Sequence, residues 1–263
     1  MSILCYHAVD PAWRSPLAIS PDVFAQQCAW LGRHRRVASL TEVLGRMNGS
    51  ARLPRGVSVL TFDDGFAGVH THAFPVLLRH RLPATMFLVA QTLTAAGRPV
   101  DWVDDPPPDP AQEGEGTATS PLRTLTKDQV LEMQAAGINF GSHSYAHHDL
   151  TTLSEGECER DLRASREALE DLLARPVRLL AYPRGRHNER VRQAAARAGF
   201  SHAFSLPEGP EPNGPHAVPR VGVWAHDRPA SLRLKTADWY VRVRTSRVYR
   251  FTRAAQWRRR FTG

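Results

Sequence analysis

Cysteines are few in this sequence, and long apolar runs are absent. The 263 residues include three cysteines, Cys5, Cys28 and Cys158, and their odd number and wide spacing exclude a disulfide framework and agree with a reducing compartment. No run approaches the roughly 18 apolar residues that cross a bilayer. The N-terminal MSILCYHAVDP also lacks the basic and apolar segments of a secretory signal. The sequence therefore predicts a cytoplasmic protein.

Acidic residues are scarce in the last part of the chain. Residues 233–263 hold nine arginines and Lys235 against Asp238 alone, whereas the rest of the chain carries one more acid than base. The net charge of +8 thus belongs to the tail, and we expect no specific nucleic-acid partner for the body. Aromatic residues interleave the arginines, as in segments that bind an anionic membrane surface, which would make the protein membrane-peripheral. A terminal helix or strand with a solvated arginine face is the alternative.

The chain is long enough to bury one large core, and 42% of its residues are hydrophobic. Segments typical of strands, such as 57–62 and 84–90, alternate with segments typical of helices, such as 154–174. This alternation predicts an α/β protein with a parallel sheet or barrel. Residues 94–121 are rich in proline, glycine and acids, which indicates a loop insertion. We expect a catalytic domain over 1–232 and a separate tail over 233–263.

Two adjacent acids, Asp63 and Asp64, follow the predicted buried strand 57–62. Neighbouring carboxylates repel each other, and burial raises the cost of keeping both ionised, so a positive charge must balance them if they are not a solvated turn. His143 and His147 are spaced so that both imidazoles could bind one divalent ion together with a carboxylate. A second carboxylate beside such an ion would serve as a base in metal-assisted hydrolysis. Non-haem iron enzymes use the same set of two histidines and one carboxylate. A pair of histidines that binds no metal is the other interpretation.

These motifs resemble those of the NodB-homology polysaccharide deacetylases, carbohydrate esterase family 4. TFDDG and GSHSYAH are similar to the first and second motifs of that family. The resemblance covers roughly residues 1–225 and implies a distorted (β/α) barrel of about seven parallel strands. It also implies that Asp63 is the catalytic base and that Asp64, His143 and His147 bind a divalent metal. The metal of such enzymes is usually zinc, with cobalt, nickel or manganese as alternatives.

The segment AYPRG resembles the third motif of the family. By this resemblance Tyr182 and Pro183 belong to the substrate-binding wall, and the backbone N–H of Arg184 faces the oxyanion of the reaction.

The third motif also departs from the family pattern, because Ala181 stands where an arginine usually holds the base. Arg220 or Arg178 could take over that contact, and the sequence does not choose between them. Arg220 is also expected among the substrate-binding residues.

The general acid of the family is normally a histidine near the C-terminus, but His216 and His226 do not stand in the usual Leu-x-His context. The opening CYHAVD, followed by LAISPDVFAQQCAWL, resembles instead the permuted branch that is similar to poly-N-acetylglucosamine deacetylases. This resemblance implies that His7 is the general acid. A core histidine at a strand end is the alternative.

The sequence thus predicts a metal-dependent hydrolase that removes acetyl groups from N-acetylated amino sugars in a polysaccharide, oligosaccharide or glycoside. One alternative is a catalytically inactive carbohydrate-binding relative, which the missing arginine would permit. Another is a non-haem metal enzyme of a different reaction type. Trp13, Trp102 and Trp224 are candidates for sugar stacking, with simple packing as the other interpretation.

Overall fold

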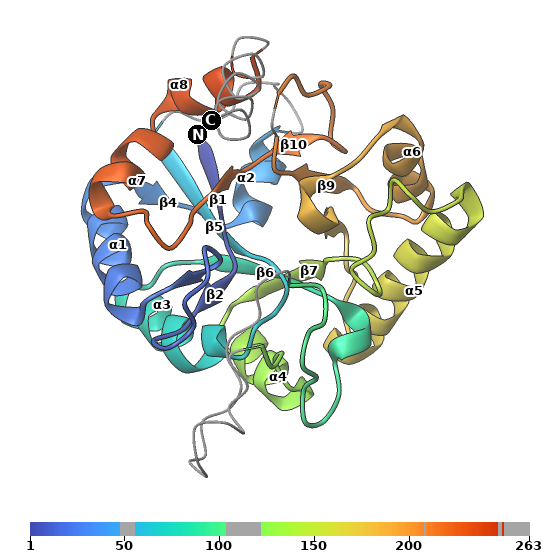
Figure 1. Ribbon diagram of the computed structural model, residues 1–263, viewed down its shortest axis with the longest axis horizontal. Coiled ribbons are helices and arrows are strands. Elements are labelled where there is room, and N and C mark those ends of the chain that lie inside the picture. The colour runs from blue at the N-terminus through green and yellow to red at the C-terminus, as the bar shows by residue number, and fades with distance from the viewer. Residues whose placement is uncertain (48–55, 104–121, 208, 247–248, 250–263) are drawn as a thin grey trace, which may run out of the picture.

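The computed structural model describes residues 1–47, 56–103, 122–207, 209–246 and 249. Strands run through the centre of the molecule, and most of the helices form a ring around them (Figure 1). Each main strand is followed by a helix or a loop that returns the chain to the opposite edge, as expected for parallel pairing. The predicted α/β class is therefore confirmed.

The main sheet has nine strands, all paired in parallel, in the order β10-β9-β8-β7-β6-β5-β1-β11, with β4 paired to β5 outside this path. A second, two-stranded sheet joins β2 to β3. The strands are β1 (Ser2–Tyr6), β2 (Ala8–Val9), β3 (Ala18–Ile19), β4 (Arg36–Val37), β5 (Val57–Phe62), β6 (Ala84–Leu88), β7 (Asn139–Ser142), β8 (Leu179–Ala181), β9 (His202–Ser205), β10 (Val218–Pro219) and β11 (Val221–Gly222).

The barrel closes where one short segment changes its neighbour. β10 pairs with β9 and β11 pairs with β1, and Arg220 alone separates the two. The backbone N–H of Arg220 donates to Ser205 on one side, and that of Val223 donates to Cys5 on the other. β10 and β11 are two halves of one segment, which pairs with β9 at one edge of the sheet and with β1 at the other. The sheet is therefore a nearly closed barrel. The expected distorted (β/α) barrel of about seven parallel strands is confirmed.

The helices are α1 (Pro21–His34), α2 (Leu40–Met47), α3 (Phe74–His80), α4 (Lys127–Ala135), α5 (Glu155–Leu173), α6 (Glu189–Arg197), α7 (Pro229–Lys235) and α8 (Asp238–Arg244). The main helix starts follow the capping signals of the sequence. At α5, the Ser154 hydroxyl accepts from the Glu157 backbone N–H while the Glu157 carboxylate accepts from Ser154, which forms a capping box. The expected insertion at 94–121 falls for the most part on residues 104–121, which lie outside the described residues.

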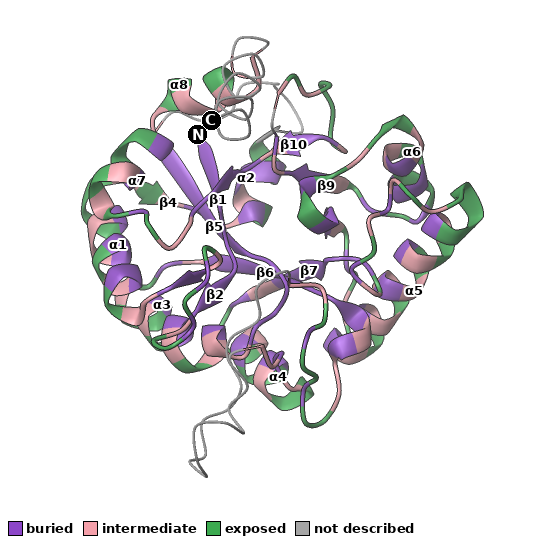
Figure 2. Cartoon of the chain, in the orientation of Figure 1, coloured by how far each residue is buried: buried purple, intermediate pink, exposed green. Residues whose placement is uncertain are grey.

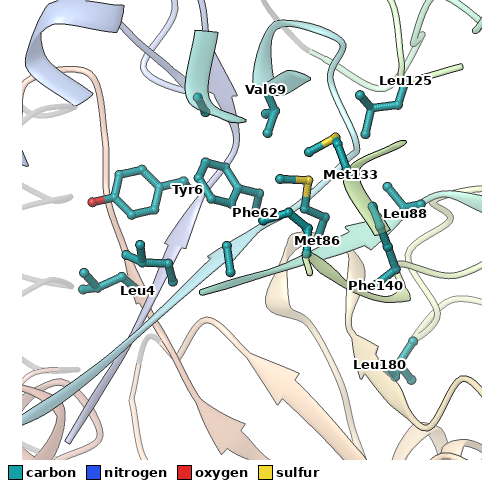
Figure 3. Close-up of a cluster of buried hydrophobic side chains, with 14 of the residues drawn as sticks. Leu4, Tyr6, Phe62, Val69, Met86, Leu88, Leu125, Met133, Phe140 and Leu180 are labelled. Carbon is teal, nitrogen blue, oxygen red and sulfur yellow. The ribbon is translucent and has the colours of Figure 1, made fainter. Parts of the chain in front are cut away.

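The alternation of side chains along each strand separates two apolar layers. On β1 and β5, Leu4, Tyr6 and Phe62 point outward and pack under the ring of helices, in the cluster that Figure 3 shows. On the opposite faces, Ile3 and Val59 point into the barrel and pack in a second cluster that also contains Phe87 and Phe204. The strands are therefore buried on both sides, whereas the helices expose their outer faces (Figure 2).

Two short helices, α7 and α8, follow the barrel, and the expected boundary between residues 232 and 233 falls inside α7. Lys235 of α7 is buried, and its Nζ donates to the Gly222 carbonyl at 2.8 Å and to the Asp227 carboxylate. The rest of the expected tail, apart from Tyr249, lies outside the described residues from position 247 onward. None of the helices in the described part of the chain is both long and apolar enough to cross a membrane.

The buried ion pair between Lys235 and Asp227 predicts a large effect on stability. Lys235→Met leaves the Asp227 carboxylate buried without its cation, so we expect the free energy of unfolding to fall by about 3 kcal/mol. Arg233→Met, an exposed position of the same helix, is the matched control and should change it by less than about 0.5 kcal/mol. Equilibrium urea denaturation measures both values, and equal stabilities for the two variants would contradict a structural role for the pair.

Candidate active site

The polar residues expected to carry the chemistry lie at the carboxyl ends of the central strands. Asp63 and Asp64 follow β5, His143 follows β7, and His7 follows β1. All four line one pocket of about 960 Å³. Because parallel strands present their carboxyl ends at one edge, residues that are far apart in the sequence meet there. The structure thus brings together the acids and histidines that the sequence singled out.

Asp64, His143 and His147 form one compact group. The Nε2 atoms of His147 and His143 lie 3.2 Å and 3.6 Å from Oδ1 of Asp64, and all three side chains are buried. Their potential ligand atoms lie within 4.8 Å of one another. Two imidazoles and one carboxylate suit zinc and other borderline divalent cations. The group is a candidate ligand set for one divalent metal ion.

The backbone conformation and the hydrogen-bond partners of Asp64, His143 and His147 orient their potential ligand atoms. Asp64 and His147 have φ angles of 68° and 58°, a left-handed conformation that Asp and His tolerate better than most residues. Nδ1 of His143 lies 2.8 Å from the Ala181 carbonyl, so it carries the proton and leaves Nε2 as the acceptor that faces Asp64. Burial lowers the pKa of His143 to about 4, which keeps its imidazole neutral and able to bind a cation.

Trp102 contacts two residues of this candidate ligand set. Its ring stacks on the His147 imidazole, with centroids 4.5 Å apart, and its Nε1–H donates to Oδ1 of Asp64 at 3.2 Å. From the sequence alone, Trp102 is a candidate for sugar stacking or packing, and this contact with Asp64 could not be predicted. The sequence around Trp102 has no helix or strand periodicity, so it gave no indication of where the ring points.

Asp63 has a different partner from its neighbour. Arg220 donates to both of its carboxylate oxygens, from Nη1 and Nη2, at 2.7 Å each. Burial alone would raise the pKa of Asp63, but the charge and hydrogen bonds of Arg220, together with the nearby histidines, outweigh it and hold that pKa well below its usual range. Asp63 is therefore ionised at neutral pH, beside a fixed cation.

Arg220 takes the position that the sequence left open between two arginines. It is fully buried beneath Asp63, whereas Arg178 is exposed at the start of β8. Arg220 does not line the pocket described above, and its side chain holds the Asp63 carboxylate. Its expected place among the substrate-binding residues stays a prediction.

His7 lies next to Asp63 at the mouth of the barrel. It is 8% exposed, lines the pocket and stacks on Trp224, with ring centroids 5.4 Å apart. The backbone N–H of Trp224 donates to Asp227, so the buried Lys235–Asp227 pair also fixes this stack. Of the two C-terminal histidines, His216 contacts the Phe200 carbonyl, and neither His216 nor His226 lines this pocket.

Fewer side chains of the third-motif segment AYPRG line the pocket than the sequence predicts. Tyr182 and Pro183 are buried and do not line the pocket, because the Tyr182 hydroxyl turns away to donate to the His216 carbonyl. Their expected role in the substrate-binding wall stays a prediction. Arg184 does line the pocket, with a left-handed φ of 56°. Gly185 is required beside it, since a Cβ there would lie 2.4 Å from the Leu206 backbone nitrogen.

Comparison with known proteins places this site in a family. The profile of the family described as polysaccharide deacetylase matches residues 50–203, more than half of the chain, which include both aspartates and both histidines of the candidate ligand set. The chain therefore belongs to the polysaccharide deacetylase family, a family of hydrolases. His7 and Arg220 lie outside the matched range.

Individual relatives and structures agree with this assignment. YxkH of Bacillus subtilis is 24% identical over 226 residues, which are 85% of this chain and 71% of that protein. The poly-beta-1,6-N-acetyl-D-glucosamine N-deacetylase of Staphylococcus epidermidis is 26% identical over 204 residues, 73% of this chain and 62% of that enzyme, so the match spans less than two thirds of the enzyme. The deacetylase PplD of Streptococcus pyogenes shares the fold, with a TM-score of 0.72, 24% identity and coverage of 90% and 97% of the two chains. IcaB of Ammonifex degensii has a TM-score of 0.66 and 26% identity, with coverage of 89% and 96%.

The two contacts of Trp102 predict that it strengthens metal binding. Trp102→Phe keeps the ring on His147 but removes the N–H that holds Asp64, so we expect the affinity for zinc to fall about tenfold. Competition with a chromophoric chelator measures this affinity. Trp239→Phe is the matched control, because that indole of α8 is exposed and does not line the pocket. If both variants bind zinc as tightly as the native protein, Trp102 does not orient Asp64.

Proposed function

We propose that this protein is a metal-dependent N-deacetylase that removes acetyl groups from N-acetylated amino sugars. The observation that carries this proposal is the division of the aspartate pair. Asp64 faces two histidines that suit a divalent cation, and Asp63 faces a fixed arginine that keeps it ionised. The staphylococcal relative, named as an N-deacetylase of poly-beta-1,6-N-acetyl-D-glucosamine, supports an amide of an amino sugar as the bond that is hydrolysed.

Asp64, His143 and His147 would hold the metal, for which we propose zinc, with cobalt, nickel or manganese as substitutes. When bound, the ion would supply a Lewis acid and lower the pKa of a water molecule. Asp64 suits this role because the hydrogen bond and charge of His147, together with the charges of His143 and His7, outweigh the effect of burial and lower the pKa of its carboxyl group. The neutral imidazole of His143 offers the second donor.

Asp63 is the general base in this proposal. It takes a proton from the attacking water, whose oxygen forms a bond to the acetyl carbon. Arg220 fixes the plane of the Asp63 carboxylate with its two hydrogen bonds and keeps the group in the form that accepts a proton. The backbone N–H of Arg184, at the pocket wall, would donate to the oxygen that becomes negatively charged.

His7 is the general acid. One of its ring nitrogens lies within 4.8 Å of the Asp63 carboxylate, so an amide between them is in reach of both groups. As the carbon–nitrogen bond breaks, His7 gives a proton to the departing nitrogen, and acetate and a free amine are the products. Trp224 holds the imidazole in the plane that faces the pocket. The cytoplasmic location stays a prediction of the sequence, and we do not propose a membrane role for the tail.

Acetate release tests the reaction and separates the two aspartates. We expect acetate from N-acetylglucosamine oligomers with added zinc, and far less from O-acetylated sugars. Asp63→Asn should lower kcat by about 10²–10⁴-fold with metal content unchanged, since it removes the base. Asp64→Asn should lose the metal together with activity. Asp128→Asn, an exposed acid of α4, is the control. Normal turnover in Asp63→Asn would contradict the role of that residue as the base.

The contact between Arg220 and Asp63 predicts a separate effect on rate. Arg220→Lys keeps the charge but cannot form two parallel hydrogen bonds, so we expect kcat to fall by about tenfold or more with little change in metal content. Arg178→Lys, at the exposed alternative position, should leave kcat unchanged. Steady-state kinetics with metal analysis distinguishes the two. A native rate in Arg220→Lys would show that the bidentate contact does not matter for catalysis.

A further inference from the structure

A second group of ligand-type side chains lies beside the first. Cys5, His7 and Asp63 are all buried, and one potential ligand atom of each lies within 4.8 Å of those of the other two. The group is distinct from Asp64, His143 and His147, although the adjacent aspartates join the two sets. The proposed reaction uses His7 and Asp63 but leaves the Cys5 thiol without a role.

The local geometry of this group is close to that of a metal site. Because side chains alternate along β1, Cys5 and His7 project from the same face, toward Asp63. The Cys5 Sγ lies 3.3 Å from Oδ2 of Asp63. Sulfur and oxygen ligands of one tetrahedral zinc ion, with bonds of 2.3 and 2.0 Å, are about 3.5 Å apart. The two atoms therefore already have nearly the separation that a shared ion requires.

A further observation concerns the imidazole of His7. Its side chain is more than nine-tenths buried, at 8% exposure, and its Nδ1 has no hydrogen-bond partner among the described residues. A buried ring nitrogen without a partner is costly, and a cation would satisfy it. His7 also lines the pocket, which gives an ion a path from solvent.

We propose that Cys5, His7 and Asp63 form a second, weaker site for a thiophilic divalent cation such as Zn²⁺, Cd²⁺ or Co²⁺. On binding, the thiol gives its proton to water as the sulfur–metal bond forms, and the pocket side of the ion stays open to water. Oxygen-preferring cations such as Mg²⁺ and Mn²⁺ should not fill this site, since a thiolate and an imidazole are poor ligands for them.

Two features make this site weaker than the first. The Arg220 guanidinium already binds both oxygens of Asp63, so its charge opposes a further cation. Burial also raises the pKa of Cys5 well above its usual value, so release of the thiol proton costs free energy. The ion should therefore enter Asp64, His143 and His147 first and reach the Cys5 site only when it is in excess.

Occupation of this site would inhibit the enzyme, a consequence that depends on the proposed function. The ion would take the lone pairs of the proposed base, Asp63, and of the proposed acid, His7, at the same time. Excess zinc would thus switch the enzyme off after a first zinc ion has switched it on. The existence of the site itself does not depend on what His7 and Asp63 do in catalysis.

Titration of the metal-free protein with Co²⁺ tests the site without reference to activity. The first equivalent should give only the visible bands of a nitrogen and oxygen site. Further Co²⁺ should add the intense near-ultraviolet absorption of a cobalt–thiolate bond. Cys5→Ser and Cys5→Ala should lack this absorption, whereas Cys28→Ser, a buried cysteine of α1, should retain it. Absence of the absorption in the native protein, or its persistence in both Cys5 variants, would overturn the proposal.

Acetate release then separates this proposal from the proposed function. Native protein and Cys28→Ser should lose activity at excess Zn²⁺ or Cd²⁺ but not at excess Mn²⁺. Cys5→Ser should require at least about tenfold more zinc for half-inhibition, which corresponds to about 1.4 kcal/mol of binding free energy. If the cobalt–thiolate absorption appears but excess metal does not inhibit, the site is real and the roles of His7 and Asp63 are wrong. Equal inhibition of native protein and Cys5→Ser would overturn the inhibitory role of the site.

Discussion

The ion pair between Arg220 and Asp63 is the contact on which both the barrel and the site depend. Two adjacent carboxylates at a buried strand end are stable only if each has its own positive or hydrogen-bonding partner. Asp64 finds two histidines and an indole N–H, while Asp63 finds the guanidinium. Arg220 itself stands between β10 and β11, at the position where the segment leaves β9 and joins β1. The residue that keeps the proposed base ionised therefore lies where the barrel closes.

The pleat of β1 and β5 decides which side chains reach this ion pair. On the inner faces, apolar Ile3 and Val59 fill the barrel toward the amino ends of the two strands, and polar residues follow toward the carboxyl ends. Thr61 contacts Arg220, and Asp63 comes two residues later on the same face. A shift of either strand by one residue would exchange the inner and outer faces, so pairing register and catalytic geometry are a single constraint.

Sequence reasoning found the parts of the site that are local and missed those that depend on distant contacts. Asp63, Asp64, His143 and His147 stand in short segments at strand ends, so their meeting follows from the parallel sheet alone. The choice between Arg220 and Arg178 could not be made, because the contact with Asp63 joins residues 157 positions apart. The charge composition of residues 233–263 predicted a separate tail, yet Lys235 is buried against the loop after β11. Composition averages over a segment and cannot show a single buried cation.

The position of His7 explains why a thiol lies beside the proposed base. His7 comes just after β1, which pairs directly with β5, the strand that precedes Asp63. His7 therefore reaches the pocket from β1, and the C-terminal histidines are not needed there. Because side chains alternate along a strand, the residue two positions before His7 also faces the barrel interior. Cys5 occupies that position and donates to the carboxylate that Arg220 holds. A serine or alanine there would keep the fold of the strand. The thiol therefore stands as a candidate soft ligand at the point where the proposed acid and the proposed base are adjacent.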